Sequence, residues 1–294
     1  MNIGERIREL RISKLMTQSE LAGDRITRNM LSCIENGSAN PSLSTVLYIA
    51  GRLNVPAGFL LAEGGDEIVY RKISNLSNIK RAYTAGDLRG CRSLCISGCP
   101  EPDDEINLLL ANCDVGIAQE EFGSGRLRSS CRFFDEALSY AEKTIYPTDS
   151  VEATARLYFR YMERISHTLY SDILDEQKFI AVKSADPLSD YLDVLDELDI
   201  KNTTLAERFL QTADSSKFEY SHVKARLLIL QKEYRSAHKL LLQLLKGELS
   251  LSKVALYTVL CELELCCRET DDFKGAYNYA NGKVELLEQL LKET

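Results

Sequence analysis

Apolar residues recur at helical spacing along the first sixty residues of the chain. Four of them predict a first helix over residues 3–15, with their side chains on one face: Ile3, Ile7, Leu10 and Leu15. Charged residues fall on its opposite face: Arg6, Arg8, Glu9 and Arg11. This alternation of faces is typical of a short amphipathic helix that packs into a small core.

Local capping signals divide the next segment into two short helices. Thr17 with Glu20 forms the pattern of a capping box and opens a helix over about residues 18–23. Thr27 is a second N-cap candidate and opens a helix over residues 28–35, and Gly37 suits the left-handed position that ends many helices. The sequence therefore predicts two helices joined by a tight turn.

Two further helical segments complete this region. Ser42 after Pro41 opens a helix that runs to Leu53, and a final short turn covers residues 55–61. Within residues 28–35, Leu31 and Ile34 share one face, so the side chains opposite them are free to contact a partner. Five short helices in about sixty residues predict a small compact domain over residues 1–64.

Helical hairpins follow from Asp66 onward. A large apolar residue is repeatedly followed three positions later by a small one, as in the pairs Leu88/Cys91, Leu127/Ser130, Tyr234/Ala237 and Phe273/Ala276. The first two pairs are 39 residues apart, and so are the last two. Helix pairs repeated at this spacing bury a core by stacking on one another, which predicts an α-solenoid over residues 65–294.

The middle of this region, about residues 150–215, keeps helical periodicity but loses the repeat spacing. Its clearest breaks are at Asp186-Pro187 and at residues 201–204. Sustained strand alternation is absent from the sequence, and glycine (16) and proline (6) are scarce. We therefore predict an all-α protein.

Charge divides unevenly between the two predicted domains. Residues 1–64 hold seven basic and six acidic side chains, a net charge of +1, which leaves −9 for the remainder of a chain whose total is −8. Phosphate repels an acidic surface, so any contact with DNA belongs to the N-terminal domain.

The segments MTQSELA and TRNMLSCIENGSANPSLSTVLYIAGRLNVP resemble the Cro/C1-type (XRE) helix-turn-helix family over about residues 3–61. The resemblance implies a five-helix, lambda-repressor-like DNA-binding domain in which residues 28–35 are the recognition helix of the major groove. It also implies a phosphate contact for Gln18, at the start of the preceding helix. A helix N-terminus accommodates a phosphate, which agrees with this role.

Side-chain chemistry adds base contacts to this assignment. Arg28 can pair with guanine and Asn29 with adenine, because these are the bidentate partners that geometry favours. Ser32 lies one turn further, near a base or phosphate, and Asn36 and Ser38 in the following loop meet the DNA backbone. The full set of predicted DNA-binding residues is Thr17, Gln18, Thr27, Arg28, Asn29, Met30, Ser32, Asn36 and Ser38.

Two departures from the family pattern stand out. Only four residues separate Ala22 from Thr27, one fewer than in the commonest phage-repressor form, and this is more similar to regulators that sense small peptides. Cys33 stands where the family often has Lys or Arg, so one contact is expected to be missing. The alternative interpretation of this domain is a protein-interaction module or an antitoxin-like fold that does not read DNA.

The C-terminal region resembles tetratricopeptide repeats, whose concave face suits an extended peptide. Candidate contacts to a peptide or small effector are Asn107, Asn112, Tyr158, Tyr161 and Tyr257. For each of them, core packing or a solvated polar face is the alternative. For the region as a whole, the alternative is a purely structural role in dimerisation.

Other chemistry in the sequence is weak. Cys91, Cys95 and Cys99 share a helical spacing, but no second cysteine pair completes a zinc pattern, so we interpret them as packed thiols rather than as a metal or redox site. In Cys266-Cys267 we expect one buried and one boundary residue. The three histidines are widely separated, and phosphate-loop and hydrolase motifs are missing, so we predict neither an enzyme nor a cofactor.

Taken together, these patterns predict a sequence-specific DNA-binding regulator. A single small domain has limited affinity for DNA, so we expect a homodimer that presents two recognition helices. The chain's start lacks the apolar stretch of a signal peptide, and no apolar run is long enough to span a membrane, so we expect a cytoplasmic protein. The alternative function is a scaffold whose solenoid binds a partner protein.

Overall fold

The computed structural model describes residues 2–62, 66–174, 186–246 and 251–292, and within these ranges the chain forms sixteen helices and no strand. The predicted all-α class is confirmed. The chain divides into two compact units, Met1–Ile106 and Asn107–Thr294. The predicted boundary between residues 64 and 65 falls at positions outside the described residues and inside the first unit, and it stays a prediction.

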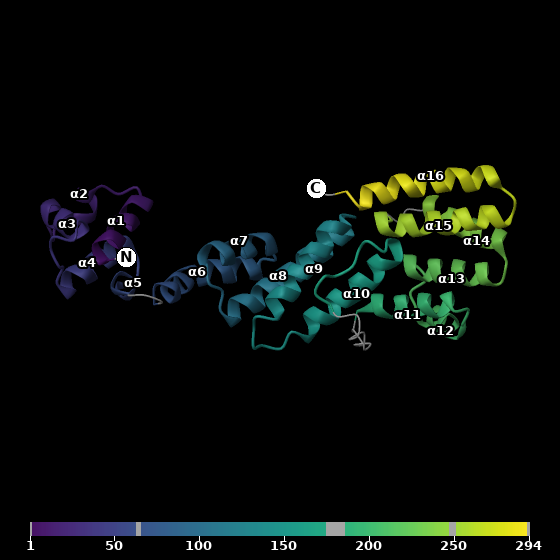
Figure 1. The fold of residues 1–294 in the computed structure, drawn as a ribbon, viewed down its shortest axis with the longest axis horizontal. Coiled ribbons are helices and arrows are strands. Elements are labelled where there is room, and N and C mark those ends of the chain that lie inside the picture. Colours follow the sequence, from purple (N-terminus) through teal and green to yellow (C-terminus); the bar gives the residue numbers. More distant parts are fainter. Residues whose placement is uncertain (1, 63–65, 175–185, 247–250, 293–294) are drawn as a thin grey trace. The chain divides into compact units, whose positions relative to one another are not determined.

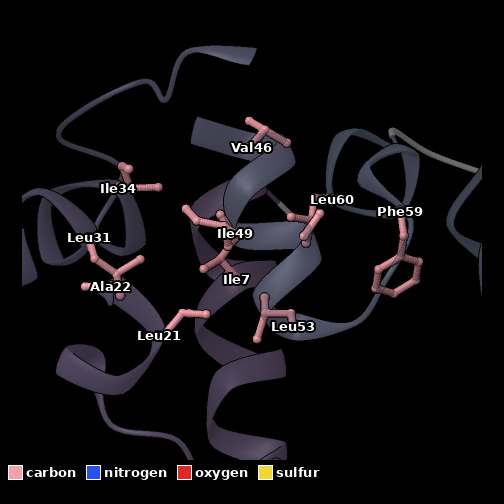
Figure 2. Packing of buried hydrophobic residues seen from close by; sticks show 11 residues of the cluster. Ile7, Leu21, Ala22, Leu31, Ile34, Val46, Ile49, Leu53, Phe59 and Leu60 are labelled. Atoms are coloured by element: carbon pink, nitrogen blue, oxygen red, sulfur yellow. The ribbon is translucent and has the colours of Figure 1, made fainter. Parts of the chain in front are cut away.

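The first five helices, here called the head, carry the predicted short segments (Figure 1): α1 Ile3–Ser13, α2 Gln18–Ala22, α3 Arg28–Glu35, α4 Leu43–Leu53 and α5 Ala57–Leu61. One cluster of buried side chains joins all five, with Ile7, Leu31 and Ile49 fully enclosed (Figure 2). Because every helix contributes to a single core, the head is one cooperative packing unit.

The predicted first helix is two residues too long. α1 ends at Ser13, and Leu15 adopts a left-handed backbone with φ of 56° and is 92% exposed. Met16 turns inward and packs against the core in its place. The expectation that Leu15 belongs to the apolar face is therefore wrong.

Two arginines that the helical pattern places on the polar face of α1 are engaged inside the head. Arg6 is 3% exposed, and its Nη1 donates hydrogen bonds to the carbonyls of Phe59, Leu60 and Ala62 at 3.1, 3.1 and 2.6 Å. Arg6 thus satisfies the carbonyl groups that the end of α5 leaves without helical partners. Arg11 is bonded to Glu35 of α3.

α6 (Asp66–Thr84) and α7 (Leu88–Gly98) complete the first unit and pack side by side. Tyr70 of α6 contacts Phe59 of α5 edge to face, with ring centroids 6.3 Å apart, and belongs to the rim of the head core. Lys72 of α6 is paired with Asp103 at 2.6 Å and with Glu105. Side-chain contacts therefore hold α6 against the head.

The second unit is a series of helices joined mostly by tight turns. In chain order they are α8 (Asp104–Gly123, which begins just before the unit), α9 (Leu127–Ala141), α10 (Asp149–Ile165), α11 (Pro187–Asp199), α12 (Thr204–Thr212), α13 (Phe218–Leu230), α14 (Tyr234–Lys246), α15 (Lys253–Glu269) and α16 (Phe273–Leu290). The pairs α13/α14 and α15/α16 pack as hairpins (Figure 1).

The large-small signal marks the start of the second helix in four hairpins. Leu88, Leu127, Tyr234 and Phe273 are the first residues of α7, α9, α14 and α16. Two positions before each of them, the backbone is left-handed, at Gly86, Gly125, Lys232 and Asp271. Three of the small residues that follow, Cys91, Ser130 and Ala237, are buried, and the Ser130 hydroxyl donates to the Ala118 carbonyl of α8 at 2.8 Å. These features support the predicted helical repeat.

The breaks predicted in the middle of the chain are confirmed. Asp186 caps α11 by accepting a hydrogen bond from the Leu188 amide at 2.9 Å, and Pro187 is the first helical residue. α11 ends at Asp199 and α12 begins at Thr204, with Lys201 in a left-handed conformation between them. This turn also contains a left-handed residue, but it lies three positions before the next helix rather than two, and the sequence carries no large-small pair there.

The clustered cysteines are packed as small apolar side chains. Cys91, Cys95 and Cys99 are buried, and burial together with Cys91 raises the pKa of Cys95 to about 12. Cys266 and Cys267 are both buried, so the expectation of one boundary residue is wrong. Within the described ranges, no helix is both long and apolar enough to span a bilayer.

Candidate nucleic-acid interface and effector cavity

The N-terminal end of α3 presents a row of exposed side chains. Thr27 caps this end, its hydroxyl accepting a hydrogen bond from the Met30 amide at 3.1 Å. Arg28, Asn29 and Met30 are exposed, and Ser32 is half-buried one turn further along. The opposite side of the helix buries apolar side chains in the head core (Figure 2). The first turn of α3 is therefore anchored from behind and open in front, which suits insertion into a groove.

A buried carboxylate fixes the other end of α3. Glu35 accepts two hydrogen bonds from Arg11, Nε to Oε1 at 2.6 Å and Nη2 to Oε2 at 3.0 Å, and one from Gln18 Nε2 at 2.8 Å. Arg11 also donates to the Met16 carbonyl at 2.9 Å. Because these groups come from α1, α2 and α3, the network ties the two helices of the motif to the helix that precedes them.

The charge of Glu35 is stabilised where it is buried. Burial alone opposes ionisation, but the hydrogen bonds from Arg11 and Gln18 and the charges of Arg11 and Arg8 outweigh it and hold the pKa of Glu35 below its ordinary value. A charged carboxylate that accepts three hydrogen bonds has little rotational freedom, so it holds the end of α3 rigidly.

The predicted DNA-binding residues fall into two groups. Arg28, Asn29 and Met30 are exposed, and their side chains make no hydrogen bond or ion pair with the part of the chain that the structure describes. Four other residues of the set make side-chain hydrogen bonds within the head: Thr17, Gln18, Thr27 and Ser38. Gln18 donates to Glu35, as described above, so its predicted phosphate contact requires the remaining capacity of its amide.

The loop and cap residues of the set close helix ends. Thr17 and Glu20 form the predicted capping box, with Thr17 N donating to Glu20 Oε2 at 2.7 Å. Asn36 ends α3, and the Ser38 hydroxyl donates to the Cys33 carbonyl at 3.0 Å. Gly37 has φ of 73°, as predicted for the helix end. Contacts of these residues with DNA stay predictions.

Basic side chains remain exposed on the head after Arg6 and Arg11 are taken out. The five exposed ones are Arg8, Lys14, Arg25, Arg28 and Arg52. The Arg25 guanidinium lies over the Tyr48 ring, 5.6 Å from its centroid, and Arg52 donates to the Glu20 carbonyl. Cys33 is exposed on α3. Of the seven basic residues in the sequence of the head, two are not exposed, so five are available to phosphates.

A cavity of about 500 Å³ lies within the second unit. Two of the predicted effector residues, Tyr158 and Tyr161 of α10, line it together with Phe122 and Phe218. Phe122 contacts Tyr158 edge to face at 5.0 Å between centroids. The charged residues that line this cavity are mainly acidic. Lys217 is the one cation among the lining residues, and the anions are Asp186, Asp190, Asp214 and Glu219.

A smaller cavity of about 200 Å³ adjoins the first at Tyr161, which lines both. Tyr257 of α15, the third predicted tyrosine, lines the smaller cavity. Burial raises the pKa of Tyr161 and of Tyr257 to about 12, so both are neutral hydrogen-bonding groups near pH 7. The structure thus places the three predicted tyrosines in two cavities that share Tyr161 as a lining residue.

The two predicted asparagines line neither of these cavities. Asn107 is buried, and its Nδ2 donates to the Lys143 carbonyl at 3.3 Å. Asn112 donates to the Leu108 carbonyl one turn earlier in the same helix, at 2.8 Å. Their proposed contact with a peptide stays a prediction, and a structural role accounts for the hydrogen bonds they make.

Sequence reasoning missed the polar residues of the smaller cavity. His222 of α13 and Glu262 of α15 are both buried there, beside Arg226. The histidine was set aside because its neighbours in the sequence form no recognisable motif. The partners of His222 are Tyr191 and Glu262, which lie 31 and 40 positions away along the chain. The only local signal is the occurrence of polar residues on a helix that is otherwise apolar.

Residues 7–60 match the helix-turn-helix family model, which spans α1 to α5 almost completely. The immunity repressor protein of Bacillus phage phi105 is 36% identical over 64 residues. That alignment covers 21% of this chain and 44% of the repressor. The N-terminal region is therefore a helix-turn-helix domain of the XRE type, as the sequence predicts.

Solved structures that align with almost the whole chain include two proteins crystallised with DNA and a peptide. Bacillus thuringiensis PlcR, in complex with the peptide PapR7 and DNA, has 12% identity and a TM-score of 0.23, with 99% of both chains covered. ComR from S. thermophilus, in complex with DNA and its signalling peptide ComS, has 16% identity and a TM-score of 0.22, with 97% of this chain and 99% of the other covered.

Proposed function

We propose that this chain is a sequence-specific DNA-binding transcriptional regulator that reads DNA with α3 and responds to an effector bound in its second unit. The observation that carries the proposal is the first turn of α3. Its three exposed side chains Arg28, Asn29 and Met30 stand on a helix that the Glu35 network holds rigidly, in a domain that matches the helix-turn-helix family.

The three side chains supply different kinds of base contact. A guanidinium at Arg28 is suited to the two acceptors of guanine, and a carboxamide at Asn29 to the acceptor and donor of adenine. Met30, 40% exposed, offers an apolar surface to a thymine methyl group. Phosphate contacts from the exposed basic residues and from capped helix ends position the helix without specifying sequence.

A homodimer is part of the proposal. The head is nearly neutral, and its positive charge is reduced further because Arg6 and Arg11 bind within it. Phosphate neutralisation supplies much of the affinity of a DNA-binding protein, so one head binds weakly. Two heads on successive half-sites, about one turn of DNA apart, double the contacts.

The first experiment separates a regulator from a protein-interaction scaffold. Genomic DNA fragments selected by the full chain give a candidate operator, which is compared with a random duplex of equal length in a salt titration. A regulator binds the operator at least about a thousand-fold more tightly and loses affinity steeply as salt increases. Equal and weak binding to both duplexes contradicts the proposal.

A second experiment tests the reading residues. Arg28→Ala and Asn29→Ala should each cost about 1–3 kcal/mol on the operator and relax the sequence preference at one base pair. Arg235→Ala, which removes an exposed arginine from α14 of the second unit, is the matched control and should leave the preference unchanged. If both head variants bind every sequence as the parent does, α3 is not the reading helix.

The effector part of the proposal rests on the two adjoining cavities, which are lined by the three predicted tyrosines. Synthetic pentapeptides from a pooled library, screened against the full chain, should include members whose binding changes operator affinity by at least about five-fold. Affinity that is insensitive to every bound peptide contradicts effector control and leaves DNA reading intact.

A further inference from the structure

We infer that the smaller cavity, bounded by Tyr161, His222 and Glu262, is a subsite for an uncharged hydrogen-bonding group of the effector, a carboxamide or a hydroxyl. The inference rests on the proposed function, because it specifies the chemistry of the ligand that the second unit binds. Two buried polar atoms, one on each of two residues that line this cavity, carry it.

The first of these atoms is Nε2 of His222. This side chain is 1% exposed, and its Nδ1 is 2.8 Å from the Tyr191 hydroxyl, within hydrogen-bond distance. Its ring also stacks on Phe218, with ring centroids 5.5 Å apart. Nε2 is buried and has no hydrogen-bond partner among the described residues. The imidazole is thus held in one orientation with one nitrogen left to bind.

The second atom is Oε2 of Glu262, a residue that is 6% exposed. Its other oxygen, Oε1, accepts a hydrogen bond from Arg226 Nη1 at 2.8 Å and lies 4.0 Å from His222 Nε2. Oε2 is buried and likewise has no partner among the described residues. Buried polar atoms in proteins are bonded in the great majority of cases, so two that share one cavity indicate a group that bonds to both.

Charge restricts what that group can be. Burial, followed by the charges of Arg226 and Arg164, lowers the pKa of His222 to about 3, so the imidazole is neutral near pH 7. The charges of Arg226 and Arg164, which lower the pKa of His222, act in the same way on a ligand cation placed beside its Nε2. A carboxylate is excluded for another reason, since it offers no hydrogen to Glu262 Oε2.

The arginines are also occupied. Arg226 donates to Glu262 and to Asp199, and Arg164 donates to Asp196 and, at 2.7 Å, to Asp199. These pairs join α10, α11, α13 and α15 into one network and leave no unpaired guanidinium to bind an anion. An uncharged group with a hydrogen to donate is what remains.

A carboxamide or a hydroxyl fits either form of the histidine. If Nε2 carries the proton, the ligand oxygen accepts from His222 while its N–H or O–H donates to Glu262. If Nδ1 carries it, an amide N–H₂ donates to both residues, and a hydroxyl donates to one of them. The adjoining cavity, with Phe122, Tyr158 and Phe218 in its wall, accommodates an apolar or aromatic part of the same ligand.

Three compounds of nearly equal shape test this assignment on the full chain. The probes are 3-phenylpropanamide, 3-phenylpropylamine and 3-phenylpropanoic acid, which present a carboxamide, an ammonium and a carboxylate on one aromatic body at pH 7. Titrations followed by ligand-observed NMR should give an affinity for the amide at least about ten-fold higher than for either charged probe.

Variants connect the preference to the cavity. Glu262→Gln turns the free acceptor into a group that can also donate, so the ratio of amide to carboxylate affinity should fall by at least about five-fold. Thr258→Leu narrows the cavity without changing its charge. It should lower the affinity for the amide probe, and not for the two charged probes, by a similar factor. Glu264→Gln is the matched control, because Glu264 pairs with Lys283 of α16 and does not line the cavity.

The outcomes separate this inference from the proposed function. Equal affinity for all three probes, or an amide preference that Glu262→Gln leaves intact, contradicts the subsite and shows that the two polar atoms bind only water. A failure of the proposed function has another signature, in which no peptide of the library changes operator affinity even though the amide probe is preferred.

Discussion

Glu35 in the first unit and Glu262 in the second are both buried carboxylates that bond to an arginine, and they differ in what remains after that bond. Both oxygens of Glu35 are used, by two hydrogen bonds from Arg11 and one from Gln18. Only one oxygen of Glu262 has a partner among the described residues, supplied by Arg226. Glu35 therefore uses both oxygens to connect helices, whereas Glu262 keeps one oxygen that a ligand can bond to.

The comparison shows how to separate two roles that look alike in a sequence. A buried charge whose bonds are all made within the protein stabilises a geometry, because any movement breaks a bond in a medium of low dielectric. A buried charge with an unmade bond carries a desolvation cost that a ligand can relieve. Residue type and burial are shared, so the hydrogen-bond count is what distinguishes them.

Removing the charge should affect the head most. Glu35→Gln leaves Arg11 with a neutral partner in a site where the carboxylate was fully bonded, and we expect a loss of about 3 kcal/mol in the stability of the head. Glu262→Gln should cost about 1 kcal/mol, because Arg226 keeps its second partner Asp199. Hydrogen exchange resolved by peptide measures each unit separately. Equal losses would remove the distinction between the two glutamates.

Acid should weaken the second unit first. The pKa of His222 falls from its ordinary 6.5 to about 3 in the folded chain, so between these values the unfolded chain binds a proton that the folded chain does not. The free energy of unfolding then decreases as pH drops below 6.5, by about 2 kcal/mol at pH 5. The pKa of Glu35 is lowered from 4.5, so its contribution is complete above pH 4.5 and is lost only below.

The histidine is responsible for this early step only if its removal abolishes the step. His222→Gln keeps a hydrogen-bonding group beside Tyr191 but cannot titrate. Peptides from α11 and α13 should show faster exchange at pH 5 than at pH 7 in the parent, after correction for intrinsic rates, and not in the variant. An unchanged pH effect in the variant would assign it to carboxylates such as those of the Arg164 network.

Close packing should also set the two units apart. A Cβ at Gly4 would lie 2.0 Å from the Ile34 carbonyl oxygen, so Gly4→Ala pushes α1 away from the end of α3. We expect a cost of about 1–2 kcal/mol, measured as a lower denaturant midpoint for the head. Gly282→Ala in α16 meets Leu260 only at 3.8 Å and should raise stability by up to about 1 kcal/mol. If Gly4→Ala leaves the denaturant midpoint unchanged, the head tolerates movement at α3.

The smallest expected effect concerns turns, where the two units should behave alike. Lys232 and Leu15 both have left-handed backbones, with φ of 62° and 56°. Replacing either by glycine relieves steric strain and should raise stability by about 0.5–1 kcal/mol. Thermal melts of Lys232→Gly and Leu15→Gly compare them directly. If one variant gains stability and the other loses it, the two units differ in backbone geometry as well as in their buried charges.

Much of the head could be predicted because its signals are local. Thr27 and Gly37 mark the two ends of α3 within eleven residues, and the helix begins and ends where they indicate. Leu15 was misplaced because its spacing fits a helix that the backbone leaves two residues earlier. The positions of Arg6 and Arg11 could not be read from the pattern, since their partners are 53–56 and 24 residues away.

The effector cavities show the same limit more strongly. The hairpin starts were predictable because a large and a small residue recur at a fixed spacing. Tyr158, Tyr161 and Tyr257 were chosen by residue type, and the fold brings them together, whereas Asn107 and Asn112 of the same selection are elsewhere. The unmade hydrogen bonds of His222 and Glu262 depend on contacts between helices that are distant in the sequence, so they can be identified only from the structure.

The exposed thiol on α3 has a practical consequence. Of nine cysteines, Cys33 alone is exposed, and the other eight are buried or half-buried. Burial raises the pKa of several of these, to about 12 for Cys95, Cys131 and Cys266, which slows their reaction with a maleimide. The natural sequence therefore accepts a fluorophore or spin label selectively on α3. In the proposed homodimer, a pair of such labels would report the distance between the two copies of α3 without a single substitution.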